Sequence, residues 1–269
     1  MINGVGCFFV SLTEIMGFDM PLRDHPTGNY RFLPGIAPYS CGVVSSPGYE
    51  IVNVTLQQPV PYQTGFDVIA NNLASEERPR TALCAIELRS PTPFSFAGFA
   101  EFNEKYASIL QSWGLFVDGM NPVARTNVAP IIGAPNEPSL YGFSFTRPCT
   151  PGLPATFVVA GAGELPEGVL SRSGVISLGD TSAAGMASKA TFVMDLMEAR
   201  LHGLGADWAS VSTIDVYTAH SLTPLLPEII LKRAGSAAIH GVNWHYSAPP
   251  ILEIEFEMDL RGTRTETMI

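Results

Sequence analysis

The second half of the chain carries the clearest periodic pattern of hydrophobic and polar positions. Between residues 185 and 205 apolar side chains recur near helical spacing and the segment ends with glycine, which predicts an amphipathic helix. A β-branched run within 206–218 predicts a strand, 222–235 predicts a second helix, and 239–246 predicts another strand. We therefore expect helices and strands to be mixed in this half.

The segment LEIEFEMD, residues 252–259, alternates strictly between apolar and acidic residues, as expected for a strand with two different faces. One face would carry Leu252, Ile254, Phe256 and Met258, and the other Glu253, Glu255, Glu257 and Asp259. Because four carboxylates on one strand face repel one another, we expect most of them on a solvated outer face.

The first half repeats this order of elements. The patterns predict a helix over 96–114 and strands over 50–58, 81–90, 125–130 and 139–146. The helix expected after the first of these strands is weak, because residues 65–79 are rich in asparagine and end in proline. We therefore interpret the first half as a trimmed version of the second.

Three prolines and a glycine in TRPCTPGLPA, residues 146–155, interrupt both patterns. We predict an N-terminal extension over 1–34, a first domain over 35–149 and a second over 150–269. Mixed elements with late hairpins indicate an α+β class, with helices packed on one face of a mixed sheet. Two such domains leave sheet faces and edges to be covered, and oligomerisation is the usual solution.

Composition narrows the classes of function. The 269 residues are 46% hydrophobic and 15% charged, which is ample for a large core. A net charge of −10 without a basic patch argues against nucleic acid as a partner, and no apolar window is long enough to span a membrane. The scattered cysteines (Cys7, Cys41, Cys84 and Cys149) and the lack of a basic secretory n-region indicate a cytoplasmic protein.

A single arginine, Arg125, lies in the otherwise uncharged run NPVARTNVAP, residues 121–130. Its guanidinium stays charged and needs an anion when buried, which is either a structural acid or a ligand carboxylate. His240 and His245 are five residues apart, so a strand would point them to opposite faces and they are no metal pair. GAGEL at 161–165 lacks the third glycine of a nucleotide fingerprint, so we expect neither metal nor cofactor.

Four segments of the first half resemble, in order, the RidA (YjgF-type) imine/enamine deaminase family. They are GIAPYSCGVV (35–44), VTLQQP (54–59), FAEFNEKYASIL (99–110) and PVARTNV (122–128). In the second half, 156–165, 202–218 and 252–259 resemble the corresponding strand, helix-to-strand joint and last strand. The resemblance implies two tandem chorismate-mutase-like domains of order β-α-β-α-β-β, a homotrimer, and ligand clefts between neighbouring domains.

The resemblance also implies site residues. The arginine that grips the substrate carboxylate falls on Arg125, and the groups that orient substrate or water fall on Tyr39, Thr55 and Asn103. The position two after the arginine, usually cysteine in the family, is Asn127.

The late-strand glutamate of the family falls on Glu253 in the second half, where it would act as general acid or base. The second half has His240 where the family arginine should stand, so neither half holds the full set. Either the two halves form one composite site, or only the cleft of the first half remains.

These observations lead to three hypotheses. The first is hydrolytic deamination of an imine or enamine on a small carboxylic-acid metabolite held by Arg125. The second is a chorismatase-like enzyme acting on a cyclic carboxylic acid, and the third is a non-catalytic small-molecule-binding trimer. A cleft that brings Arg125 and Glu253 within one ligand's length would favour an enzyme.

Overall fold

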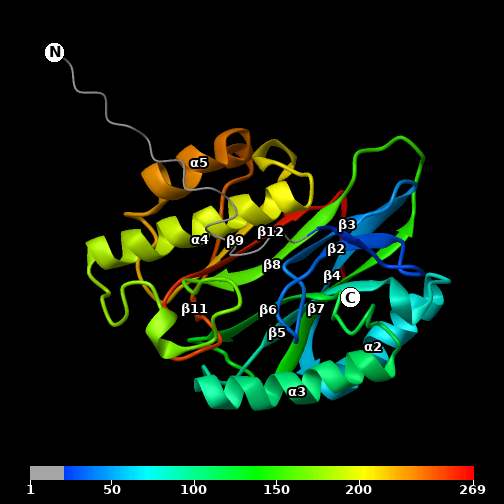
Figure 1. Ribbon diagram of the computed structural model, residues 1–269, viewed down its shortest axis with the longest axis horizontal. Coiled ribbons are helices and arrows are strands. Elements are labelled where there is room, and N and C mark those ends of the chain that lie inside the picture. The colour runs from blue at the N-terminus through cyan, green and yellow to red at the C-terminus, as the bar shows by residue number, and fades with distance from the viewer. Residues whose placement is uncertain (1–20) are drawn as a thin grey trace.

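The computed structural model describes residues 21–269, so Cys7 and the first 20 residues of the predicted extension lie outside the described part. Two β-sheets pack face to face, and helices cover the outer face of each (Figure 1). A cluster of buried residues from strands of both sheets, including Phe32, Val43, Ile51, Cys84 and Val158, forms the layer between them. The α+β class and the mixed sheets expected from the sequence are confirmed.

The six-stranded sheet has the order β11-β6-β5-β7-β4-β13. Its strands are β4 (Tyr49–Pro61), β5 (Leu83–Arg89), β6 (Ala124–Pro130), β7 (Ser139–Pro148), β11 (Ser247–Ala248) and β13 (Thr265–Met268). The pairs β5/β6 and β4/β13 are parallel, and the other pairs are antiparallel. Helices α2 (Tyr62–Ser75) and α3 (Phe96–Ser112) cover its outer face, and the short η1 (Arg80–Ala82) precedes β5.

The seven-stranded sheet has the order β1-β2-β3-β8-β12-β9-β10, and only its β9/β10 pair is parallel. Its strands are β1 (Arg23–Asp24), β2 (Tyr30–Leu33), β3 (Gly42–Ser45), β8 (Phe157–Gly163), β9 (Thr213–Tyr217), β10 (Asn243–His245) and β12 (Glu257–Gly262). The long helix α4 (Ala183–Gly203) covers its outer face. Shorter helical segments complete this half: η2 (Arg172–Gly174), η3 (Trp208–Ser210), η4 (Leu226–Leu231), α5 (Lys232–Ala234) and η5 (Gly235–His240).

Side-chain caps fix where the two longest helices begin. The Oγ of Ser95 accepts the backbone N–H of Gly98 at 3.1 Å at the start of α3, and Ser182 accepts that of Gly185 at 3.2 Å at the start of α4. Each bond satisfies one of the donors that a helix leaves free at its first turn. Both helices then bury one face against a sheet, as their periodicity predicts.

Several elements depart from the sequence-based expectation. The first helix is not trimmed: α2 has 14 residues and begins at Tyr62, directly after β4. The segment predicted as a helix over 222–235 contains the six residues of the π-helical η4, followed by the three residues of α5. The strand predicted over 239–246 is only the three residues of β10, because η5 occupies the segment before it.

The acidic segment 252–259 differs most from its prediction. A turn closes over 251–254, with the N–H of Ile254 donating to the carbonyl of Ile251 and Glu253 in the left-handed region at φ 72°. The strand therefore begins only at Glu257. Glu257 and Asp259 point between the two sheets and are 3% and 2% exposed, so the predicted solvated face is wrong for both.

Strand pairing crosses the predicted boundary at residue 149. From the first half, β3 pairs with β8 in the seven-stranded sheet; from the second half, β11 and β13 pair with β6 and β4 in the six-stranded sheet. The division into two domains stays a prediction, but the sheets exchange strands across it.

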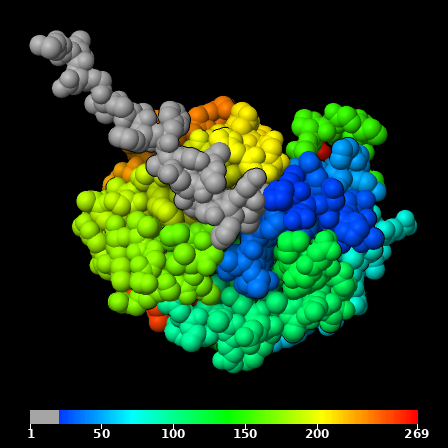
Figure 2. Space-filling view, viewed as in Figure 1, coloured from blue at the N-terminus to red at the C-terminus, as the bar shows by residue number. Residues whose placement is uncertain are grey.

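The long connection between β8 and α4 folds back over the first half of the chain. Val175 from this connection, Phe99 of α3 and Ile251 and Ile254 of the following turn form one buried cluster. In the space-filling view the lower border of this connection, in yellow-green, meets the teal surface of α3 (Figure 2). Over residues 21–269, no helix has both the length and the apolar character needed to cross a membrane.

Candidate active site

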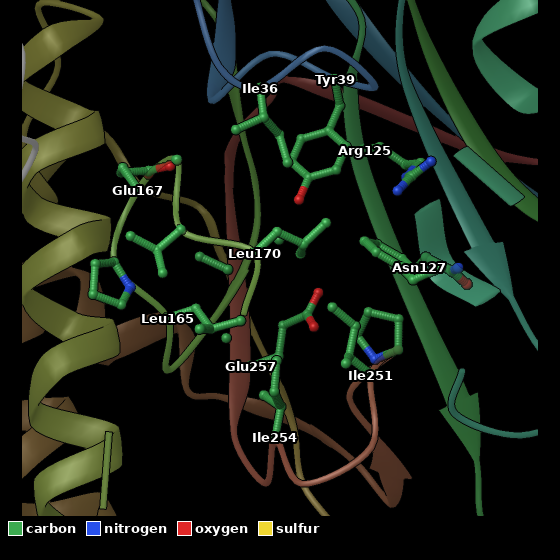
Figure 3. A pocket seen from close by; sticks show the side chains of 18 of the residues that line it. Ile36, Tyr39, Arg125, Asn127, Leu165, Glu167, Leu170, Ile251, Ile254 and Glu257 are labelled. Carbon is green, nitrogen blue, oxygen red and sulfur yellow. The ribbon is translucent and has the colours of Figure 1, made fainter. Parts of the chain in front are cut away.

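A pocket of about 650 Å³, counting its open mouth, lies where β6 of one sheet meets β8 and β12 of the other. The polar residues that line it are Tyr39, Arg125, Asn127, Glu167, Arg200 and Glu257 (Figure 3). The other lining residues are Ile36, Phe99, Leu165, Val169, Leu170, Ile251 and Ile254, together with positions 161–163, 166, 168 and 250.

Arg125 projects from β6 into a cage of aromatic rings and is 3% exposed. Its Cζ lies 4.7 Å from the ring centres of both Tyr39 and Tyr106 and 5.3 Å from that of Phe99. Nη2 donates to Oδ1 of Asn103 on α3 at 2.7 Å, whereas the buried Nη1 has no hydrogen-bond partner. Burial lowers the pKa of the guanidinium from its usual value, but an arginine stays protonated at neutral pH.

The guanidinium therefore carries a buried charge without an anion. None of the carboxylates between residues 21 and 269 forms an ion pair with Arg125. The aromatic faces stabilise the cation in part, but an unpaired N–H and an uncompensated charge favour an incoming anion. The structure thus favours the ligand over the structural acid as the partner of Arg125.

Asn127 lies beside Arg125 on the same wall, because residues two apart on a strand share a face (Figure 3). Its Oδ1 accepts the hydroxyl of Ser90 at 2.9 Å, and its buried Nδ2 has no partner. Two residues of β6 therefore carry a buried donor without a partner, Nη1 of Arg125 and Nδ2 of Asn127.

Two carboxyl groups line this pocket, and that of Glu257 is the one that forms no ion pair within the described residues. Glu257 stands at the start of β12, its carboxyl group opens into the cavity, and no hydrogen bond to it is found within the described chain (Figure 3). Burial, together with the nearby Asp259, raises its pKa well above the ordinary glutamate value, and the cations Arg125 and Arg200 offset this only in part. This shift favours the neutral acid form of Glu257, which can donate a proton.

Tyr39 faces Glu257 across the cavity. Its hydroxyl and the carboxyl of Glu257 point toward each other from opposite sides of the pocket (Figure 3). Burial raises the pKa of Tyr39 to about 12, against the pull of Arg125, so the hydroxyl is a neutral donor and acceptor.

A second arginine, Arg200 of α4, lines the pocket and was not among the residues predicted from the sequence. Its Nη2 and Nε lie 2.6 and 2.7 Å from Oε1 of Glu167, and its Nη1 donates to the carbonyl of Ala160 at 2.8 Å. The pocket thus holds one arginine without an anion and one that is paired with a carboxylate of its own chain.

Two of the predicted residues lie outside the pocket. The carboxylate of Glu253 accepts Nε and Nη2 of Arg172 at 2.6 and 2.7 Å at the protein surface, and these bonds lower its pKa. Thr55 lies on β4, which β5 and β7 separate from β6. The structure therefore brings together Tyr39, Arg125 and Asn127, with Asn103 directly behind the arginine, but neither Thr55 nor Glu253.

A fully buried ion pair positions the strand that carries Glu257. Nζ of Lys189 on α4 donates to Oε1 of Glu164 at 3.0 Å, and both side chains are 0% exposed. The same carboxylate accepts the backbone N–H groups of Glu255 at 2.6 Å and Phe256 at 3.0 Å. The turn before β12 is thereby held against the loop that follows β8.

The described residues, 21–269, include no group of three or more His, Cys, Asp or Glu side chains arranged to hold a metal ion. The chemistry that the pocket itself offers is the binding of a carboxylate at Arg125 and proton transfer at Glu257.

Comparison with known proteins gives a match over nearly the whole described chain. A family model described as "2-aminomuconate deaminase CnbZ" matches residues 22–267. The 2-amino-5-chloromuconate deaminase of Comamonas testosteroni is 38% identical over 245 residues, which cover 90% of this chain and 96% of that protein.

Solved structures give more distant matches. A chorismatase crystal structure matches at 12% identity and a TM-score of 0.48, over 90% of this chain and 78% of that one. The YjgF gene product of E. coli matches at 11% identity and a TM-score of 0.28, over 40% of this chain and 80% of that one.

Proposed function

Since the chain belongs to the 2-aminomuconate deaminase CnbZ family, we propose that its pocket around Arg125 and Glu257 releases ammonia hydrolytically from 2-aminomuconate and related enamines. Membership of this family confirms the deaminase hypothesis over the chorismatase-like and non-catalytic alternatives. The single observation that carries the assignment to this pocket is that the Glu257 carboxyl, which has no ion-pair partner in the described chain, and the buried guanidinium of Arg125, whose Nη1 has no partner, line the same cavity.

The reaction has a simple balance. 2-Aminomuconate is an unsaturated six-carbon dicarboxylate whose amino group is on the carbon next to one carboxylate. Protonation of the carbon chain converts the enamine to a protonated imine, water adds to the C=N bond and gives up one proton, and the neutral tetrahedral adduct loses ammonia to leave a ketone. The enzyme must therefore hold the carboxylate, deliver a proton, and orient one water molecule.

Arg125 suits the carboxylate next to the reacting carbon. A bound carboxylate would accept the unpaired Nη1, compensate the buried charge and leave the Asn103 bond intact. Asn127, with its unused Nδ2, is the second donor for the same anion. The aromatic cage limits access of water to this ion pair, which strengthens it.

Glu257 supplies the proton. As a neutral acid it protonates the enamine, and the resulting carboxylate then takes a proton from the attacking water. Tyr39 on the opposite side orients that water with its neutral hydroxyl. In this proposal Glu257, and not Glu253, fills the role that the family resemblance assigns to a late-strand glutamate.

The test is ammonia release from freshly prepared 2-aminomuconate by the wild type and three variants. Glu257→Gln should lower kcat by about 10²–10⁴ with little change in KM, since it removes only the proton donor. Arg125→Lys should mainly raise KM, because it keeps the charge but loses the planar pair of donors. Glu253→Gln should retain full activity; a large loss there, with an active Glu257→Gln enzyme, would overturn the assignment.

We also propose that the chain forms a homotrimer of tandem RidA-like domains, divided near residue 149. The order of the RidA-like segments in the sequence supports the tandem arrangement. Exposed apolar side chains near the short edge strands β10 and β11, namely Trp244, Tyr246 and the 80% exposed Ile132, support an intermolecular contact. Light scattering after size-exclusion chromatography should give three times the mass of one chain, and a monomer would contradict the trimer.

A cytoplasmic location is proposed on the chemistry of the thiols. Cys41, Cys84 and Cys149, the three cysteines within the described residues, are all free. Free thiols persist in reducing compartments. Cell fractionation would test the location, and recovery with an oxidising compartment would contradict it.

A further inference from the structure

We propose that Arg200 is the receptor for the distal carboxylate of a dicarboxylate substrate, and that Glu167 occupies this receptor until the substrate displaces it. The proposal rests on the proposed function and deepens it, because it names the group that selects dicarboxylates over monocarboxylates.

The first observation is the geometry around Arg200. The guanidinium is 3% exposed and anchored by its Nη1 to the carbonyl of Ala160 at 2.8 Å. Its other two nitrogens, Nε and Nη2, both lie close to one carboxylate oxygen of Glu167, at 2.7 and 2.6 Å. A protein carboxylate thus stands on the pocket side of Arg200 as a substrate carboxylate would, and it shows that this position binds an anion.

The second observation is where Glu167 lies in the chain. It follows Pro166 in a tight turn closed by the bond from the N–H of Val169 to the carbonyl of Pro166. Gly168, the next residue, has a φ of 74°, which such a turn requires at this place. Because Glu167 is at the tip of a surface turn and not within β8, its side chain can leave Arg200 without disturbing the sheet.

The third observation is the charge balance of the pocket. Arg125 has no anion, whereas Arg200 and Glu167 neutralise each other. A monocarboxylate needs only Arg125, but a dicarboxylate brings a second negative charge that Arg125 cannot compensate. Displacement of Glu167 toward solvent frees Arg200 for that charge and leaves both buried guanidinium groups paired.

The region between the two arginines suits the carbon chain of such a substrate. Leu165, Leu170, Ile251 and Ile254 line the same cavity as both guanidinium groups. The positive charges of Arg125 and Arg200 both act to lower the pKa of Glu257, whose carboxyl lines the same cavity. A six-carbon chain held at both ends would therefore pass beside the proton donor, with apolar walls around its double bonds.

Binding of two matched probes tests this inference without turnover. Muconate and sorbate share a six-carbon diene and one carboxylate, and only muconate has the distal carboxylate. Isothermal titration calorimetry should show tighter binding of muconate by the wild type. Glu167→Gln removes the competing anion and should tighten muconate binding about five- to tenfold, with sorbate unchanged. Arg200→Lys should remove the preference for muconate.

Glu198→Gln is the matched control. Glu198 is on α4, the helix of Arg200, but lies outside the pocket, where it pairs with Arg233 of α5. This variant should change neither affinity. Equal affinities of the wild type for the two probes, or an equal effect of Glu167→Gln on both, would overturn the inference. The proposed function fails separately, if the wild type releases no ammonia from 2-aminomuconate whatever its preference between the probes.

Discussion

Replacement of Lys189 by methionine should destabilise the protein at neutral pH, although Lys189 lies outside the pocket. The change keeps most of the side-chain volume but removes the ammonium group that pairs with Glu164 at 3.0 Å. The carboxylate left behind would be 0% exposed and would keep only the N–H groups of Glu255 and Phe256 as donors. Loss of one partner of a buried ion pair costs about 3–5 kcal/mol in the free energy of unfolding.

The loss should depend on pH in a defined direction. Burial already raises the pKa of Glu164 above its ordinary value, against the pull of Lys189, and without Lys189 it would rise further. A carboxyl with a raised pKa in the folded state binds more protons folded than unfolded, so stability falls as pH rises above the unfolded value of about 4.3. The difference between wild type and variant should therefore be smallest near that value and grow toward neutrality.

Urea unfolding of the wild type, Lys189→Met and the double variant Lys189→Met/Glu164→Gln at a series of pH values measures this directly. The neutral glutamine no longer needs a cation, so the double variant should recover most of the loss at neutral pH. A single variant within 1 kcal/mol of the wild type at neutral pH would refute the reasoning. If the loss in the free energy of unfolding did not depend on pH, its cause would be the altered packing at residue 189 and not the unpaired charge of Glu164.

Three further outcomes follow from the geometry of the pocket. The wild-type kcat should fall as pH rises through the raised pKa of Glu257, because the acid form is then lost. In Glu257→Gln the kcat should no longer fall over this pH range, and a pH profile of kcat for both enzymes checks this. Gly161→Ala should lower kcat strongly and stability only slightly, because the new methyl group would collide with the end of the Glu257 side chain; parallel assays of ammonia release and urea unfolding separate the two effects. Thr126→Val should cost about 1–3 kcal/mol in urea unfolding, because it removes a donor to Asp259 and the acceptor of the Gly161 N–H.

Local periodicity was sufficient for the two longest helices. The predicted helices over 96–114 and 185–205 are α3 and α4, within two residues at each end, because each has an apolar face and a serine cap. Pairing between strands had no such signal. No pattern in residues 42–45 indicates that β3 pairs with β8 across more than a hundred residues of chain.

The pocket was predictable only in part. Resemblance led to Tyr39, Asn103, Arg125 and Asn127, which the structure brings together. It led to Glu253 and not Glu257 because strict alternation fixes the face of a strand but not the residue at which the strand begins. In a regular strand Glu253 and Glu257 would share a face, and the turn over 251–254 separates them.

Arg200 and Lys189 could have been found from the sequence. Both occupy positions on the apolar face of α4, three residues from Met197 and Met186 respectively, and both are buried. The argument that a charge in an apolar pattern needs a specific partner, applied to Arg125, applies equally to them. Their partners, Glu164 and Glu167, follow β8 in an irregular loop and have no periodicity that would identify them.

The exchange of strands between the two sheets has a consequence for synthesis on the ribosome. Residues 265–268 complete the edge of a sheet whose longest strand, β4, is made some two hundred residues earlier. β3 likewise lacks its partner β8 until translation has passed residue 157. Sheets assembled from such distant segments fold slowly, and their open edges are exposed to wrong pairing in the meantime. The nascent chain cannot complete either sheet before nearly all of it has been translated, so we expect its yield to depend on chaperones that shield these edges during translation.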